Sequence, residues 1–188
     1  MVDEAVVGVR LAEFRLRAEP LGVAVSRVGG TAMAVATLVE WLAGVGGGAV
    51  IVAEELAKRA PELVAGLGGA GVSVRGAAPP RETRDAPAGI SLAQLAVAET
   101  GSMLLSEPSL ADRSVGMLVL AQVIVCPTAA LVATLDEAVP LLREIALGPG
   151  GSFATFVTGP SRTADIERVL TVGVQGPGVV MTLFVDEL

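Results

Sequence analysis

The sequence has 188 residues, of which 52% are hydrophobic and 3% aromatic, and its formal net charge at pH 7 is -7. The length suits one domain with a substantial core, whereas the acidic balance and scarcity of aromatic rings argue against binding to nucleic acid. The chain has one cysteine and no histidine, which excludes an internal disulfide, a triad that uses His, and a zinc or iron-sulfur site built from Cys and His of this chain alone.

The single cysteine, Cys126, lies in the apolar run AQVIVCPTAALV with no basic residue nearby. Cysteine in such surroundings is usually a small buried thiol, because a reactive thiolate needs positive charge close to it. We therefore assign no reactive role to Cys126. We also predict no metal site, with a hard cation held by carboxylates and waters as the open alternative.

Residues 114–135 contain no charged side chain and would be long enough for a membrane-spanning helix. The segment MLVLAQVIV within them is rich in β-branched residues and stops before Pro127, which is typical of a buried strand. The first twenty residues carry evenly spread charges, which leaves no room for the apolar core of a signal peptide. The sequence thus predicts no membrane span and a cytoplasmic location.

The first half of the chain alternates between helical and extended patterns. In chain order we expect a helix over 4–19, a strand over 22–28, a helix over 31–46 capped by Thr31, a strand that begins at 47, a helical region over 55–71 broken at Pro61, and a strand over 72–76.

Residues 76–89 are charged and rich in proline, and they read as a solvated connection in preference to a mobile lid. After them we expect a helix over 91–99, strands over 102–106 and 117–126, a helix over 134–145, a strand over 153–157, a short helix after Pro160 and a last strand over 179–185.

Alternation of this kind, with strands that are continuously apolar, predicts an α/β fold in which helices cover both faces of a mainly parallel sheet. We expect residues 1–188 to form a single domain. In open sheets of this class, ligands bind outside the carboxyl ends of the strands.

The stretch TGPSRTAD places a turn directly after the strand FATFV and before an expected helix. Free N–H groups at a helix start, the hydroxyls of Ser161 and Thr163, and the guanidinium of Arg162 would together form an anion site after Gly159 and Pro160. The alternative is that Ser161 or Thr163 only caps the helix.

A second candidate is AETGSMLLSE, in which Glu99 ends an expected helix and Thr100, Gly101 and Ser102 turn the chain into a strand. A carboxylate at a helix C-terminus is destabilised by the helix dipole, so its presence there suggests a functional or structural role. Glu99 is either a nucleophile or base, or an acceptor for nearby backbone N–H groups.

The glycine turn GVQGPG at 173–178 is a third, weaker candidate. If the three turns lie at one edge of a parallel sheet, they should line one cleft. The side chains expected there are those of Glu99, Ser102, Ser161, Arg162 and Gln175.

The order and spacing of AETGSMLL, Arg113 with a long apolar strand, TGPSRTADIE and GVQGP resemble the LUD domain of the lactate-utilisation protein C family. The resemblance is strongest from about residue 90 to the end. It implies a fold similar to the CoA-transferase, ribose-phosphate isomerase and formyltetrahydrofolate cyclo-ligase group. It also implies a role in oxidising L-lactate to pyruvate beside partner proteins that carry the iron-sulfur clusters.

The chain departs from the family pattern on the long apolar strand and in the final turn. Where the family usually has Pro and then His on the strand, this chain has Val119 and Gln122, and the turn has Gln175 in place of His. Glutamine keeps a hydrogen bond but cannot carry protons near neutral pH or bind transition metals readily.

Three functions follow from these features. The preferred one is an accessory subunit of a lactate-oxidising system that binds a small anion and has no cofactor of its own. The others are a free-standing enzyme related to CoA-transferases or isomerases that uses Glu99, and a degenerate binding module.

Overall fold

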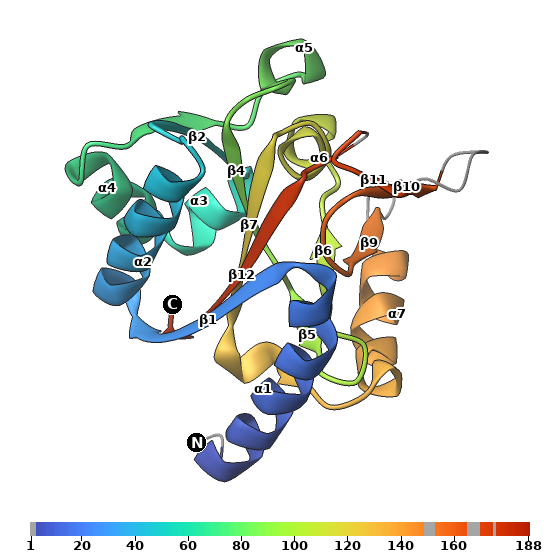
Figure 1. The fold of residues 1–188 in the computed structure, drawn as a ribbon. Helices are drawn as coiled ribbons and strands as arrows, with labels where there is room; N and C mark the ends of the chain where they lie inside the picture. Colours follow the sequence, from blue (N-terminus) through green and yellow to red (C-terminus); the bar gives the residue numbers. More distant parts are fainter. Residues whose placement is uncertain (1–2, 149–152, 165–169, 175) are drawn as a thin grey trace.

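The computed structural model describes residues 3–148, 153–164, 170–174 and 176–188, and a six-stranded sheet forms its centre (Figure 1). All neighbouring strands in this sheet are parallel, in the order β1-β12-β7-β4-β2-β3. The predicted mainly parallel sheet is therefore confirmed. The strands are β1 (Val23–Gly30), β2 (Ala49–Val52), β3 (Ser73–Gly76), β4 (Ala88–Leu92), β7 (Ala121–Pro127) and β12 (Val179–Glu187).

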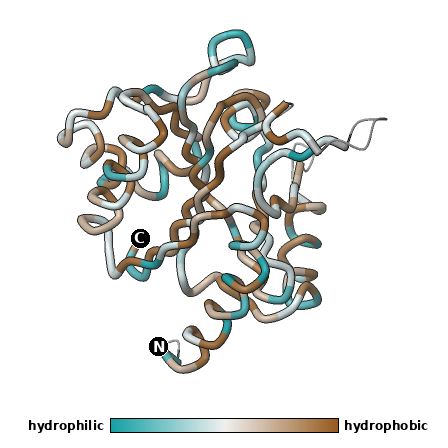
Figure 2. The backbone as a smooth tube through the Cα atoms, in the orientation of Figure 1, coloured by the Kyte–Doolittle hydropathy of each residue, from teal (hydrophilic) through white to brown (hydrophobic). Residues whose placement is uncertain are grey.

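Three helices cover one face of the sheet, on the left of Figure 1: α2 (Thr31–Gly44), α3 (Glu54–Arg59) and α4 (Pro61–Gly69). Leu38 and Leu67 pack there with Val123 and other apolar side chains of β2, β4, β7 and β12. Burial on both faces explains why the central strands are continuously hydrophobic (Figure 2). The cap of α2 is Gly30, so the expected capping role of Thr31 is wrong.

The helices α1 (Glu4–Ala18) and α6 (Leu110–Met117) lie on the opposite face, together with a second sheet. Phe14 of α1 meets Phe184 of β12 edge to face, with ring centroids 5.1 Å apart. Helices on both faces are thus confirmed, whereas the second sheet was not predicted. Its strands, in the order β8-β5-β6-β9, are β8 (Leu131–Val132), β5 (Leu95–Val97), β6 (Ser102–Ser106) and β9 (Ala154–Val157).

The outer side of the second sheet packs against α7 (Val139–Leu147) and against the short 3-10 helix η3 (Leu135–Ala138). Two further 3-10 helices, η1 (Glu19–Leu21) and η2 (Thr128–Ala130), follow α1 and β7. A two-stranded antiparallel ribbon of β10 (Arg162–Ala164) and β11 (Leu170–Val172) lies at the side of the molecule near β9 (Figure 1).

Two predicted segments are wrong around residue 90. The loop over 76–89 contains the short helix α5 (Pro80–Thr83) and the first residues of β4, and the expected helix over 91–99 is instead the end of β4 followed by β5. Alanine and leucine favour a helix locally, but residues 95–98 are all buried. Pairing of β5 with β6 and β8 satisfies their backbone groups instead.

The strand expected over 117–126 begins at Ala121, because the preceding residues belong to α6 and its end. None of the helices in the described ranges combines the length and the apolar character that a membrane crossing requires.

Candidate functional site

Glu99 lies in the turn between β5 and β6, not at the end of a helix. Its backbone N–H donates to the carbonyl of Ala133 at 3.0 Å, and its carboxylate accepts a hydrogen bond from the N–H of Leu135 at the start of η3. The carboxylate therefore accepts from a backbone N–H group, in line with the second of the two roles that the sequence left open.

We expect Glu99→Ala to lower the free energy of unfolding by about 1 kcal/mol, since loss of a side-chain cap costs roughly 0.5 to 2 kcal/mol. Urea denaturation measures this loss, and Glu99→Gln, which keeps an oxygen acceptor, should lose less. An alanine variant as stable as the wild type would show that the contact to Leu135 contributes nothing.

Gly101 and Ser102 connect the β5–β6 turn to two other parts of the chain. Gly101 has φ of +65°, and a Cβ atom there would lie 2.9 Å from the backbone nitrogen of Ala18, so the turn packs tightly against the end of α1. The hydroxyl of Ser102 lies 2.7 Å from that of Thr158. The hydroxyl of Thr100 is buried without a hydrogen-bond partner among the described residues.

The short helix expected after Pro160 is wrong over the described residues, because Arg162–Ala164 form strand β10 and pair with β11. The N–H of Ser161 donates to the carbonyl of Pro177 at 2.9 Å, and the guanidinium of Arg162 donates to the carbonyl of Leu21. These donors hold the turn in place. Residues 165–169 lie outside the described residues.

The turn after β9 and the turn before β12 meet. A Cβ atom on Gly176 would lie 3.3 Å from the hydroxyl oxygen of Ser161 and 3.8 Å from the carbonyl oxygen of Met117, and Gly159 lies against Leu21 and Val23. This junction lies at the amino ends of β1, β7 and β12. The expected carboxyl edge is wrong for this turn because β9 belongs to the second sheet and pairs antiparallel to β6.

One of the predicted site residues, Glu99, stands apart from this junction, because it bonds to Leu135 and Ala133 on the side of η3. Gln175 lies outside the described residues. Thr163 pairs with Thr171 in the β10–β11 ribbon.

A polar cluster that the sequence did not predict lies buried beneath α6. The hydroxyl of Ser91, on β4, donates to the carboxylate of Glu107 at 3.1 Å, and both side chains are buried. Gln122, on β7, is 1% exposed, and its amide nitrogen has no hydrogen-bond partner among the described residues. A Cβ atom on Gly116 would lie 3.0 Å from that nitrogen and 3.7 Å from a Glu107 oxygen, so both groups face the same glycine of α6.

Burial raises the pKa of Glu107 to about 7, and the nearby carboxylate of Asp112 acts in the same direction. The Ser91 hydroxyl and the guanidinium of Arg113 oppose this shift but do not cancel it. A carboxyl group with this pKa can accept or donate a proton near neutral pH. It is the strongest candidate for acid-base chemistry in the described part of the chain.

Helix α6 is held over this cluster by its own capping contacts. Ser109 accepts a hydrogen bond from the N–H of Asp112 at 3.0 Å and donates to the Asp112 carboxylate at 2.8 Å. The same carboxylate accepts from the N–H of Glu54 at the start of α3. Arg113 lies over the ring of Phe153, with its central carbon 4.6 Å from the ring centroid.

We expect Gln122→Leu to leave the free energy of unfolding unchanged or to raise it, because a buried donor without an acceptor costs about 1 to 3 kcal/mol. Thermal or urea denaturation measures the difference. A loss of more than about 2 kcal/mol, the scale of truncating a satisfied buried polar group, would mean that the amide has a bound acceptor in solution.

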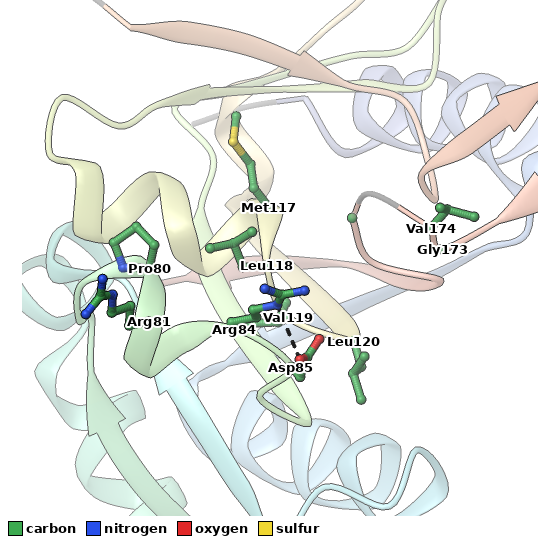
Figure 3. A pocket seen from close by; sticks show the side chains of 11 residues that line it. Pro80, Arg81, Arg84, Asp85, Met117, Leu118, Val119, Leu120, Gly173 and Val174 are labelled. Carbon is green, nitrogen blue, oxygen red and sulfur yellow. Dashed lines mark ion pairs between the residues drawn. The ribbon is translucent and has the colours of Figure 1, made fainter.

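A pocket of about 460 Å³ opens at the amino ends of the adjacent strands β4, β7 and β12 (Figure 3). Arg81 and Arg84 reach it from the segment before β4, Leu120 from the segment before β7, and Val174 from the turn before β12. Met117, at the end of α6, also lines it. The pocket is therefore built by three segments that are far apart in the sequence.

Cys126 is fully buried, and burial raises the pKa of its thiol, so it is not a reactive nucleophile. Within the ranges that the structure describes, no three acidic, cysteine or histidine side chains are grouped so that they could hold a metal ion.

Comparison with known proteins identifies the relatives of this fold. The sequence-family model of the LUD domain matches residues 11–185. Lactate utilization protein C of Shouchella clausii is 35% identical over 104 residues, which are 54% of this chain and 45% of that protein. The protein of the same name from Bacillus subtilis is 33% identical over 99 residues, 52% of this chain and 41% of that protein.

The chain thus spans less than half the length of these curated relatives. The crystal structure of a DUF162 family protein from Deinococcus radiodurans superimposes with a TM-score of 0.65 at 20% identity, covering 98% of this chain and 99% of that one. This likeness shows the shared fold. Because the domain match runs through nearly the whole sequence, the chain belongs to the LUD domain family.

Proposed function

We propose that this protein is an accessory subunit of a cytoplasmic system that oxidises L-lactate to pyruvate, and that it works with iron-sulfur partner proteins. The observation that carries the proposal is the LUD domain match over residues 11–185, with two curated relatives named Lactate utilization protein C. The assignment to lactate comes from those relatives. The proposal that partner proteins hold the iron-sulfur clusters comes from the residue types of this chain.

Oxidation of lactate to pyruvate releases two electrons, which need an acceptor. An iron-sulfur cluster is usually held by four cysteine thiolates, whereas this chain has one cysteine, buried in the core, and no histidine. The electrons must therefore pass to a redox group that is not bound through cysteine or histidine of this chain. A partner that carries clusters would supply this function.

The proposal includes a small anion bound at the junction of the β5–β6 turn and the turn after β9. The hydroxyls of Ser102 and Thr158 lie 2.7 Å apart, and Ser161, three residues after Thr158, adds a third hydroxyl to this region. Arg162 would add positive charge if it exchanged its contact with Leu21 for the ligand. The residues proposed to surround the anion are Thr100, Gly101, Ser102, Gly159, Pro160, Ser161, Arg162, Thr163 and Gln175.

Affinity purification from cells grown on L-lactate tests the partner. The tagged chain should bring down proteins with bound iron and acid-labile sulfide in stoichiometric amounts, while the purified chain alone should contain neither. Recovery of the chain without any iron-containing protein under mild salt conditions would contradict the proposed assembly.

Thermal unfolding tests the anion. L-lactate or pyruvate at millimolar concentration should raise the melting temperature, because a ligand that binds only the folded state stabilises it. The shift should disappear in a Ser161→Ala, Arg162→Ala double variant and persist in Lys58→Ala, which removes an exposed cation of α3. An equal shift in the double variant, or none in the wild type, would remove the case for this site.

A further inference from the structure

The pocket at the amino ends of β4, β7 and β12 has a surface that the proposed lactate role does not use. Met117 is 43% exposed, Leu120 56% and Val174 58%, and all three line this one cavity. They come from two segments that are far apart in the sequence, 117–120 and 173–176 (Figure 3). Exposed apolar side chains that gather around a cavity, in contrast to scattered ones, indicate a binding site.

Positive charge lies beside this apolar surface. The charged residues that line the pocket are Arg81, Arg84 and Asp85, so its formal charge is +1 in a chain whose net charge is -7. Arg84 and Asp85 form an ion pair at 3.5 Å, with side chains 77% and 74% exposed. Such an exposed ion pair contributes little to stability, so Arg84 can exchange Asp85 for another carboxylate. Two guanidinium groups are then able to bind a carboxylate.

The walls of the pocket are joined by backbone hydrogen bonds. The N–H of Asp85 donates to the carbonyl of Leu118 at 2.9 Å, and the N–H of Leu120 donates to the carbonyl of Ala86 at 2.9 Å. The N–H of Gly178 donates to the carbonyl of Leu120 at 3.0 Å. All three segments are thus fixed relative to one another, and a pre-formed site loses less entropy when it binds a ligand.

We propose that this pocket binds an organic carboxylate with an apolar tail. The carboxylate lies against Arg81 and Arg84, and the tail covers Met117, Leu120 and Val174. Lactate has a single methyl group and cannot cover three apolar side chains, whereas a volume of about 460 Å³ falls in the usual range for sites of larger organic ligands. This ligand is distinct from the small anion proposed above, although both sites border the turn at 173–176, where Gly176 lines the pocket and faces Ser161.

Isothermal titration with acetate, butyrate, hexanoate and octanoate, at concentrations below micelle formation, tests the proposal. Affinity should rise about two- to four-fold for each methylene added, because each CH2 that is buried contributes transfer free energy. Hexanol, which has the tail without the charge, should bind at least ten-fold more weakly than hexanoate.

The Arg81→Ala, Arg84→Ala double variant should weaken hexanoate binding by at least ten-fold, and Leu120→Ser should flatten the dependence on chain length. Both changes are at exposed positions, and circular dichroism checks that the variants fold. Lys58→Ala with Arg59→Ala, on α3, is the matched control. Affinity that is independent of chain length, or equal in the arginine variant and the wild type, would overturn the proposal.

Discussion

Glu107→Gln should stabilise the protein by about 3 kcal/mol at pH 8.5 and by only about 1 kcal/mol at pH 5.5. The folded-state pKa of Glu107 is raised from an ordinary value of 4.5 to about 7, chiefly by burial, and each unit of pKa corresponds to about 1.4 kcal/mol. A raised carboxyl pKa means that the folded state holds its proton more tightly than the unfolded state. Stability is therefore lost as pH rises between these two values and stays lower above them.

Glutamine keeps the oxygen that accepts from Ser91 and cannot ionise in either state, so the gain should begin above the unfolded-state pKa and reach its full size above pH 7. Urea denaturation at both pH values measures this gain in stability. Both values lie above the isoelectric point near 4.6, so precipitation at the isoelectric point does not interfere. Glu62→Gln, at an exposed position of α4, reports the effect of the same substitution at the surface. A gain that is equal at both pH values, or a loss at pH 8.5, would show that the Glu107 carboxylate is solvated or paired.

Gly89→Ala should destabilise the protein by about 1 to 3 kcal/mol or more, the range for overpacking a filled core. A Cβ atom there would lie 2.6 Å from the carbonyl oxygen of Val115 and 3.0 Å from a methyl carbon of Val119. Because the closest atom belongs to the backbone of α6, the helix must move away from the sheet. Gly89 is paired with Gln122 across β4 and β7, so this movement would also open the cluster around Glu107.

The same substitution at Gly8 is a matched control, because a Cβ atom on this glycine of α1 meets nothing within 4 Å. Gly8→Ala should raise stability by about 0.5 to 1 kcal/mol, the usual difference between these residues inside a helix. If Gly89→Ala is as stable as the wild type, α6 does not pack against β4 as closely as the structure shows.

The main sheet could be predicted from the sequence because burial on both faces leaves a strong local pattern. The run MLVLAQVIVC contains most of β7, and the segment VVMTLFV contains most of β12. Both are continuously hydrophobic because helices cover one face of the sheet, and α1 with the second sheet covers the other. The second sheet could not be predicted in the same way. Its strand β5 has three residues and the composition of a helix, and its pairing with β8 joins segments more than thirty residues apart.

Two of the three turns expected to line one cleft lie together, since Ser161 of the turn after β9 meets Pro177 and Gly176 of the turn before β12. The ligand-binding role of these turns stays a prediction. The helix start was wrong because Ser, Thr and Asp after Pro160 are equally suited to a cap and to a turn into a strand pair. Tertiary pairing with Leu170–Val172 decides between the two.

Glu107 was missed because SEPSL reads as a polar turn, and its burial depends on α6 folding over it. A local signal was present, since Ser109 and Asp112 have the spacing of a helix N-terminus. Recognising α6 would have placed a carboxylate between a strand and a helix. Its partner Ser91 was hidden by the incorrect helix over 91–99.

Growth of a deletion strain tests the proposed role in lactate oxidation most directly. Removing this chain from its natural host should abolish or strongly slow growth on L-lactate as the sole carbon source, while growth on pyruvate continues at the normal rate. Expression of the wild-type chain from a plasmid should restore growth on L-lactate. Normal growth of the deletion strain on L-lactate, with no second protein of this family in the host to replace it, would contradict the account.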